Sequence, residues 1–249
     1  MAKTSDIGWT DATFSPWWGC VKVSPACTNC YAEAFAKRVG QRVWGINAPR
    51  RFFGDKHWAE PLKWNRQAEK ESKRMRVFCA SMADVFEDRS DMNPHRARLW
   101  DLIGQTPNLD WLLLTKRPHR VHELVPPRWM ADGFPTNVWM GTTVESPDYY
   151  ERIEALVDLP ARIRFLSCEP LLARLGDIDL LGISWLIAGG ESGPRPREMR
   201  IEWLHELELR CVLRGIPLFV KQDSGRFPGR QGRIPDEMWA RKEIPEVRP

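Results

Sequence analysis

Short apolar runs alternate with longer polar stretches over most of the chain, beginning near residue 76. Each run has the length of a strand buried on both faces, and each is followed by polar residues and then by a helix-like spacing of apolar positions. Strands are predicted at residues 76–80, 111–115, 138–142, 163–167, 185–188 and 217–221. With a short first strand near residues 9–14, the alternation predicts an α/β fold with a single TIM-like parallel β/α barrel, complete or partial.

Helices are expected between these strands, at residues 94–103, 118–124, 148–157 and 201–214. In the last, apolar residues recur at the spacing of one helix face, which predicts packing on the sheet. Residues 1–225 are therefore expected to form the barrel domain.

The composition changes from residue 226 onward, where Pro, Gly and charged residues dominate. Residues 226–249 are expected to form a loose tail, with one short helix near residues 235–241.

Residues 44–66 interrupt the alternation with a basic, aromatic and irregular stretch. We interpret it either as an insertion that forms a lid or as a surface loop whose aromatic side chains cap the barrel edge. None of the five histidines shows zinc-protease spacing, and His57, in this stretch, is the one retained as a candidate.

A chain of 249 residues is long enough for one sizeable core. No apolar run approaches the roughly 20 residues that cross a bilayer, and no apolar signal segment is visible, so a cytoplasmic protein without a membrane partner is expected. The net charge of +4 permits an anionic partner such as nucleic acid without requiring one. Six cysteines are too few for a disulfide scaffold, and a reducing compartment leaves thiols free for metal.

Cys20, Cys27 and Cys30 lie close together, directly before a helix-like stretch. Cys27 and Cys30 are expected on one face of the first helical turn, and the bend at Ser24 and Pro25 lets Cys20 fold back toward them. Three thiolates at a helix N-terminus suit an iron-sulfur cluster with one open iron, or a zinc ion that takes a fourth ligand. Buried or disulfide-bonded cysteines are the structural alternative.

Polar residues follow each predicted strand, at the edge where a parallel barrel has its active site. They are expected to surround one pocket with carboxylates, cations and hydroxyls, a mixture suited to a zwitterionic ligand. Ion pairing across the barrel mouth, and a plain glycine turn after the strand at 185–188, are the alternatives. The candidate ligand-binding residues are Ser81, Asp84, Lys116, Glu145, Glu169, Gly189, Gly190, Glu191 and Lys221.

Residues 14–20 and the block at 24–33, together with the motifs at the strand ends, resemble a family of unknown function. That family was first catalogued from bacteriophage genes and is common in bacteria, and its members look like distant relatives of the radical S-adenosylmethionine (SAM) enzymes. The resemblance extends to about residue 225, and the three-cysteine block is its most specific part. Six residues separate Cys20 from Cys27 and two separate Cys27 from Cys30, a spacing that differs from that of the standard enzymes.

The resemblance implies a [4Fe-4S] cluster on the three cysteines, whose open iron binds the amino and carboxylate groups of SAM. One electron, supplied through the cluster by a reductant protein, would cleave SAM to methionine and a 5′-deoxyadenosyl radical that abstracts hydrogen from a substrate. The basic, aromatic loops favour a nucleic acid or nucleotide as that substrate. The rival interpretation is a non-enzymatic module on a degenerate barrel, with zinc or a structural cluster on the same cysteines and residues 50–64 gripping nucleic acid.

Overall fold

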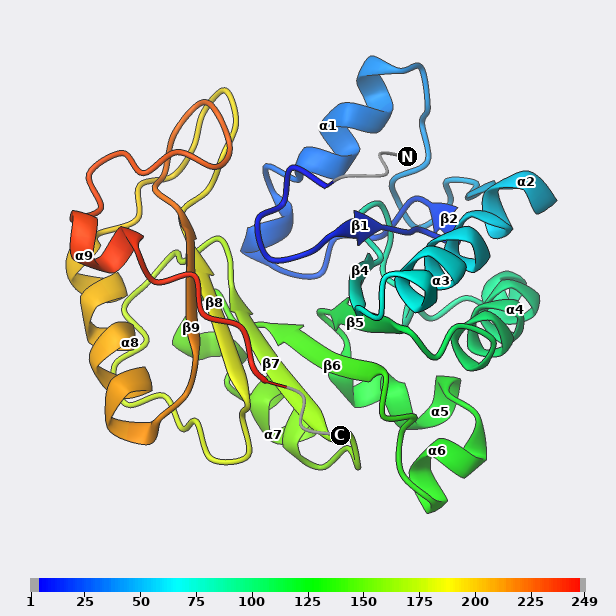
Figure 1. The fold of residues 1–249 in the computed structure, drawn as a ribbon. Coiled ribbons are helices and arrows are strands. Elements are labelled where there is room, and N and C mark those ends of the chain that lie inside the picture. Colours follow the sequence, from blue (N-terminus) through cyan, green and yellow to red (C-terminus); the bar gives the residue numbers. More distant parts are fainter. Residues whose placement is uncertain (1–4, 247–249) are drawn as a thin grey trace.

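The structure, a computed structural model, describes residues 5–246 and has a seven-stranded parallel sheet at its centre. The strand order is β1-β4-β5-β6-β7-β8-β9, and all six pairings are parallel. The sheet curls, with helices on its outer side (Figure 1). In the described residues the edge strands β1 and β9 do not pair, so the predicted barrel is confirmed in its partial form. The strands are β1 (Ala12–Thr13), β4 (Met75–Cys79), β5 (Leu109–Thr115), β6 (Val138–Thr143), β7 (Ile163–Cys168), β8 (Trp185–Gly189) and β9 (Leu218–Gln222).

The six strands predicted from apolar runs are all present, with ends shifted by one or two residues. The prediction succeeds because these strands are buried on both faces of the sheet and are therefore apolar throughout. Every residue of β6 and of β8 is buried. The first strand is shorter than predicted, since only Ala12 and Thr13 pair with β4.

The four helices expected between strands are also present, although residues 118–124 divide into a 3-10 turn and α5. Helix α8 buries Leu204, Leu207 and Cys211 and ends at Gly215, which adopts the left-handed conformation with φ 63°. None of the helices in the described residues is both long and apolar enough to cross a membrane. The helices are α1 (Tyr31–Arg38), α2 (Asp55–Trp58), α3 (Glu60–Lys70), α4 (Asn93–Gly104), α5 (Val121–Leu124), α6 (Pro127–Ala131), α7 (Glu151–Val157), α8 (Ile201–Arg214) and α9 (Asp236–Trp239).

The stretch 44–66 forms β3 (Arg51–Phe52), which pairs antiparallel with β2 (Trp17–Trp18), and continues into α2 and α3. Trp58 and Trp64 are buried in the main core, so these aromatic side chains cap the edge of the barrel. The stretch thus contains the capping aromatic side chains of the second interpretation, and its role as a lid stays a prediction.

The segment after residue 225 packs against the sheet, which corrects the expectation of a loose tail. Ile234 and Met238 are buried in the main core, and Lys242 forms an antiparallel bridge with Phe219 of β9. The indole N–H of Trp185 donates a hydrogen bond of 2.9 Å to the carbonyl of Glu243. A few apolar side chains spaced among polar ones anchor the segment, and average composition does not reveal them.

Both ends of the described chain cover the inner face of the curled sheet. Trp9 packs on Phe78 of β4, with ring centroids 4.7 Å apart, and on Trp185 of β8, at 6.2 Å. Ile7 and Ile244 pack against the same aromatic cluster. These side chains fill the interior of the barrel.

Candidate functional site

A cavity of about 810 Å³ lies at the carboxyl ends of the strands. All three cysteines of the block line it from one side, and residues at the ends of six strands line it from the other. Of the residues predicted to bind a ligand, those that line the cavity are Ser81, Asp84, Lys116, Glu169, Gly190, Glu191 and Lys221. The structure places these side chains at one cavity, and their role in ligand binding stays a prediction.

Two of the predicted ligand-binding residues lie outside the cavity lining. Glu145 is fully buried and pairs with Arg152 of α7, with 3.0 Å between Oε2 and Nη1, so its carboxylate stabilises the packing of a helix on the sheet. Gly189 lies where β8 approaches β9, and a Cβ there would come within 3.1–3.2 Å of the Gln222 backbone. Close strand packing, rather than ligand binding, explains this glycine.

His57 does not line the cavity either. Its Nε2 atom lies 2.9 Å from the carbonyl oxygen of Ser15, and its ring stacks on Phe53 with centroids 4.1 Å apart. These contacts give it a structural role at the barrel edge.

The cysteine block differs locally from the predicted helical turn. Pro25 begins a separate 3-10 turn that ends at Cys27, and Cys30 directly precedes α1. Cys27 and Cys30 therefore do not share the first turn of one helix, and the expectation that they do is wrong. All three thiols are free and half-buried, and all line the cavity.

Burial governs the protonation of two of these thiols. It raises the pKa of Cys20 to about 12, with a further increase from Asp84 and an opposing effect of Arg117. Burial also raises the pKa of Cys30, against which the Lys116 ammonium acts. Binding of a metal would therefore release protons from these thiols. Within residues 5–246, no group of three or more His, Cys, Asp or Glu side chains lies close enough to hold a metal ion.

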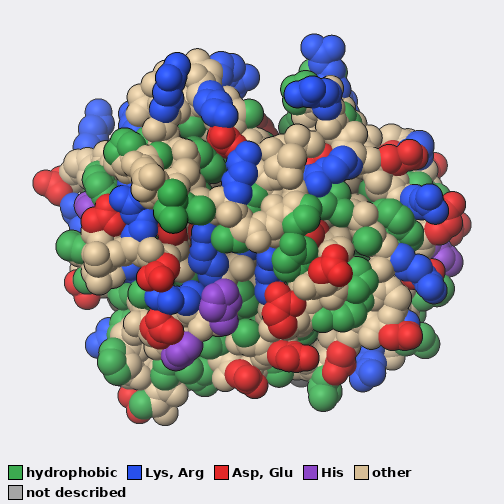
Figure 2. Space-filling view, turned by 180° about the vertical axis from the view of Figure 1, so that it is seen from behind, with side chains coloured by type: hydrophobic (Ala, Val, Ile, Leu, Met, Phe, Trp, Pro, Cys, Tyr) green, Lys and Arg blue, Asp and Glu red, His purple; other side chains and the backbone are tan. Residues whose placement is uncertain are grey.

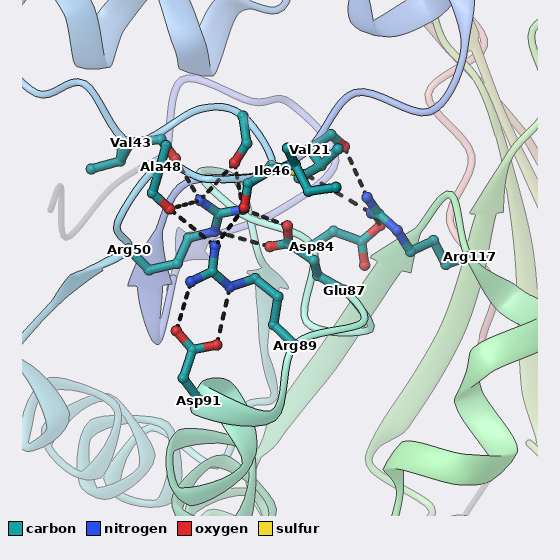
Figure 3. A network of polar contacts seen from close by, with 12 residues as sticks. Val21, Val43, Ile46, Ala48, Arg50, Asp84, Glu87, Arg89, Asp91 and Arg117 are labelled. Atoms are coloured by element: carbon teal, nitrogen blue, oxygen red, sulfur yellow. Dashed lines mark hydrogen bonds and ion pairs between the residues drawn. The ribbon is translucent and has the colours of Figure 1, made fainter.

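Arg117 holds the cysteine loop against the sheet (Figure 3). Its guanidinium donates hydrogen bonds of 2.8 Å to Asp84 Oδ2 and to the carbonyl of Val21, and it lies 3.9 Å from Cys20 Sγ. Asp84 also accepts a hydrogen bond of 2.8 Å from Thr115 Oγ1. Both carboxylate oxygens of Asp84 are thus hydrogen-bonded within the protein, Oδ2 to Arg117 and Oδ1 to Thr115, although Asp84 lines the cavity.

Arg50 is buried beside this clamp, as Figure 3 shows, and its side chain is 0% exposed. It pairs with Glu87 and donates hydrogen bonds of 3.0 and 2.8 Å to the carbonyls of Val43 and Ala48. The interpretation that residues 50–64 grip nucleic acid is therefore wrong for Arg50, because its guanidinium is already fully hydrogen-bonded inside the protein.

Glu191 forms a second clamp on the other side of the loop. It accepts hydrogen bonds from Asn29 Nδ2 at 2.8 Å and from the Arg197 backbone and Nε at 2.9 and 3.0 Å. Arg197 in turn donates to the carbonyl of Pro25 at 3.0 Å. Burial alone would raise the pKa of Glu191, but the bonds from Arg197 and Asn29 outweigh it and lower the pKa.

Lys116, Glu169 and Lys221 present charge to the cavity that is only partly compensated. The Lys116 ammonium contacts Thr143 Oγ1 at 3.3 Å and has no carboxylate partner within residues 5–246. Lys221 Nζ lies 3.1 Å from Glu169 Oε1, so ion pairing, the alternative weighed for these charges, occurs here. Among the described residues, however, no donor makes a hydrogen bond to that buried oxygen.

Aromatic residues that sequence reasoning missed form the opposite wall: Trp9, Phe78, Phe219 and Trp239. Lys242 lies among them, with its Nζ atom 3.2 Å from the ring centroid of Trp239, and burial lowers its pKa to about 8. Trp239 and Lys242 were overlooked because they fall in the supposed tail. The apolar residues at 234, 238, 239 and 244 were the available signal that this segment folds.

The family model described as "Protein of unknown function (DUF5131)" matches residues 4–241. The chain belongs to this family. That membership agrees with the expected resemblance to a family of unknown function. No curated protein matches the chain.

Solved structures with a similar backbone to the DUF5131 chain are those of spore photoproduct lyase. A cysteine-to-serine mutant of that lyase has 14% sequence identity and a TM-score of 0.49, over 75% of this chain and 57% of the lyase. The lyase complexed with dinucleoside spore photoproduct has 14% identity and a TM-score of 0.46, over 78% and 58%. A mutant with bound AdoMet and the dinucleoside has 12% identity and a TM-score of 0.46, over 80% and 60%. The DUF5131 chain thus covers less than two thirds of the lyase.

Proposed function

We propose that this DUF5131 protein is a radical-SAM-type iron-sulfur enzyme with a cluster on Cys20, Cys27 and Cys30. The observation that carries the proposal is the single cavity at the carboxyl end of a partial parallel barrel, where three free thiols from one loop face partly uncompensated charges from the strand ends. Parallel barrels generally place their chemistry at this end.

The donor set fits a cluster better than a zinc ion. Each thiolate of a cluster binds its own iron, so the three sulfurs surround a larger body than one metal ion. Three free thiols that line one cavity are the donor set that a cluster with one open iron requires.

Cys20, Cys27 and Cys30 would hold the cluster, which, when bound and reduced, would supply the one electron that cleaves SAM to methionine and a 5′-deoxyadenosyl radical. Lys116 would hold the SAM carboxylate, and the Glu169 carboxylate, which lines the cavity beside Lys221, would accept a hydrogen bond from its amino group. The clamps at Arg117 and Glu191 fix the cysteine loop, and the aromatic wall limits the entry of water to the radical.

Substitution of these two charged residues tests the assignment. In protein reconstituted with iron and sulfide, Lys116→Met and Glu169→Gln are expected to weaken SAM binding roughly 10- to 100-fold, because the first removes a charged hydrogen-bond donor and the second removes the negative charge that attracts the amino group. Equilibrium dialysis with labelled SAM gives the affinities, and release of methionine and 5′-deoxyadenosine after chemical reduction gives the activity. Lys63→Met, which breaks an exposed ion pair on α3, is the control. A parent protein that does not bind SAM, or variants that bind it like the parent, would contradict the proposal.

A further inference from the structure

The mouth of the cavity carries exposed aromatic and basic side chains on two sides. Tyr31 and Phe35 line the cavity and are 53% and 37% exposed, and Pro228 and Gly229 line it from the opposite segment. Phe227, which directly precedes them, is 61% exposed. We call the two sides together the rim: on one side Tyr31 and Phe35 with Arg38 at the end of the same helix, and on the other Arg226, Phe227 and Arg230, which flank the lining residues Pro228 and Gly229 in the chain.

None of the three rim arginines forms an ion pair with a carboxylate of residues 5–246. Arg38 lies over the ring of Phe35, 5.2 Å from its centroid, and Arg226 lies over Phe227 at 5.6 Å. By contrast, Lys22 in the cysteine loop pairs with Glu33 at 2.7 Å. The rim therefore combines positive charge available to an anionic ligand with aromatic faces open to stacking.

The surrounding surface extends this charge. In the space-filling view, Lys and Arg side chains stand along the upper edge on both sides of a notch (Figure 2). Figure 1 places α1 and the loops that follow β8 and β9 at the same edge. A groove that joins positive charge with exposed aromatic rings is the usual way in which proteins hold a single strand of nucleic acid.

The cavity behind the rim suits one base of such a strand. The rings of Phe219 and Trp239 line its wall, and the Lys242 ammonium, which has no carboxylate partner in the described chain, lies over both rings. A nucleotide that enters this chamber places its ring against aromatic side chains and its phosphate near positive charge, with the cysteine loop directly above.

We infer that the rim binds single-stranded nucleic acid and directs one base into the cavity. The inference deepens the proposed function, on which the chemical role of the bound base rests. Binding at the rim itself requires neither cluster nor SAM, so it is measured on protein without either, and the two proposals fail separately.

Fluorescence anisotropy with labelled oligonucleotides of about twelve residues tests this inference. Single-stranded DNA and RNA probes, each measured over a series of salt concentrations, are compared with the corresponding duplex. Tighter binding of a single strand than of duplex is expected, with an affinity that falls steeply as salt rises. Phe227→Ala should weaken binding about tenfold or more through lost stacking, and Arg226→Ala should lower the salt slope by about 0.7.

The control variants are Leu213→Ala and Arg214→Ala on α8, where Leu213 is 82% exposed away from the cavity lining. These two should bind like the parent. Equal binding of duplex, equally effective competition by polyglutamate, or rim variants that bind like the parent would each overturn the inference. If single strands bind as expected but the protein holds no cluster, the inference about the rim is supported and the proposed radical-SAM-type function is contradicted.

Discussion

Asp223, one residue beyond β9, is only 3% exposed and yet is held in its ionised form. Burial by itself raises its pKa, but hydrogen bonds from the side chain and backbone of Arg233 and from the Ser224 backbone outweigh this effect and lower the pKa. The side-chain bonds from Nε and Nη2 of Arg233 measure 2.9 and 2.8 Å. This pair fastens the segment after β9 to the sheet.

Asp223→Asn is expected to lower the free energy of unfolding by about 1–3 kcal/mol at pH 7. Because the folded-state pKa of Asp223 is lowered, its contribution is fully present above the unfolded-state pKa of about 3.9 and is lost as the pH falls through the folded-state value. The difference between parent and variant should therefore narrow as the pH decreases from about 6 to 3.

Urea unfolding at a series of pH values measures this difference. Asp132→Asn, at an exposed position, is the control and should follow the parent at every pH. A stability difference that stays constant or widens toward low pH would contradict the role given to Asp223.

For single residues, the sequence could place polar side chains at the strand ends, but it could not assign their ion-pair or hydrogen-bond partners. Lys116 and Glu169 line the cavity, whereas Glu145 and Asp84 form buried ion pairs with Arg152 and Arg117. Position along a strand follows from periodicity, while pairing depends on residues far away in the chain.

Among the elements, the cysteine loop and the strap at residues 43–50 are held by buried charges rather than by regular secondary structure. Arg50 links three backbone carbonyls of the strap to Glu87 beyond β4. The rigidity of the strap behind the cysteine loop therefore depends on one buried ion pair.

Arg50→Met is expected to cost about 3–5 kcal/mol of unfolding free energy, because it leaves the Glu87 carboxylate buried without its partner. The double variant with Glu87→Leu should be less unstable than the sum of the single variants, since it removes both charges. Urea unfolding of all four proteins gives the coupling energy.

A double-mutant cycle on the exposed pair of Glu60 and Lys63 on α3 is the matched control. The coupling energy between these two side chains is expected to be less than about 1 kcal/mol. Additive losses at Arg50 and Glu87 would show that the buried pair does not act as a unit.

The sequence predicted the elements best where burial repeats regularly. Strands β4 to β9 and helix α8 follow from their apolar patterns, and short helices inside irregular stretches, such as α2 and α6, do not. The turn at Pro25 also lay beyond prediction in detail, because a proline permits both the start of a helix and a separate turn.

The whole molecule determines the cavity, since no single segment encloses it. Its lining runs from Asp6 to Lys242 and takes in the cysteine loop, the strand ends and the segment after β9. The sequence predicted the polar side and the three cysteines, which belong to local motifs. The aromatic side was missed because it forms only when the two ends of the chain pack on the curled sheet.

The central claim is that the three cysteines hold an iron-sulfur cluster with an open iron that binds SAM. The most direct measurement is made on protein purified without oxygen, by counting iron, sulfide and zinc per chain and recording the electron paramagnetic resonance spectrum after reduction, with and without SAM. Roughly four irons per chain and a spectrum that changes when SAM is added are predicted, with iron lost in Cys27→Ala and retained in Cys211→Ala. Bound zinc, the absence of metal, or a spectrum that does not respond to SAM would contradict the claim.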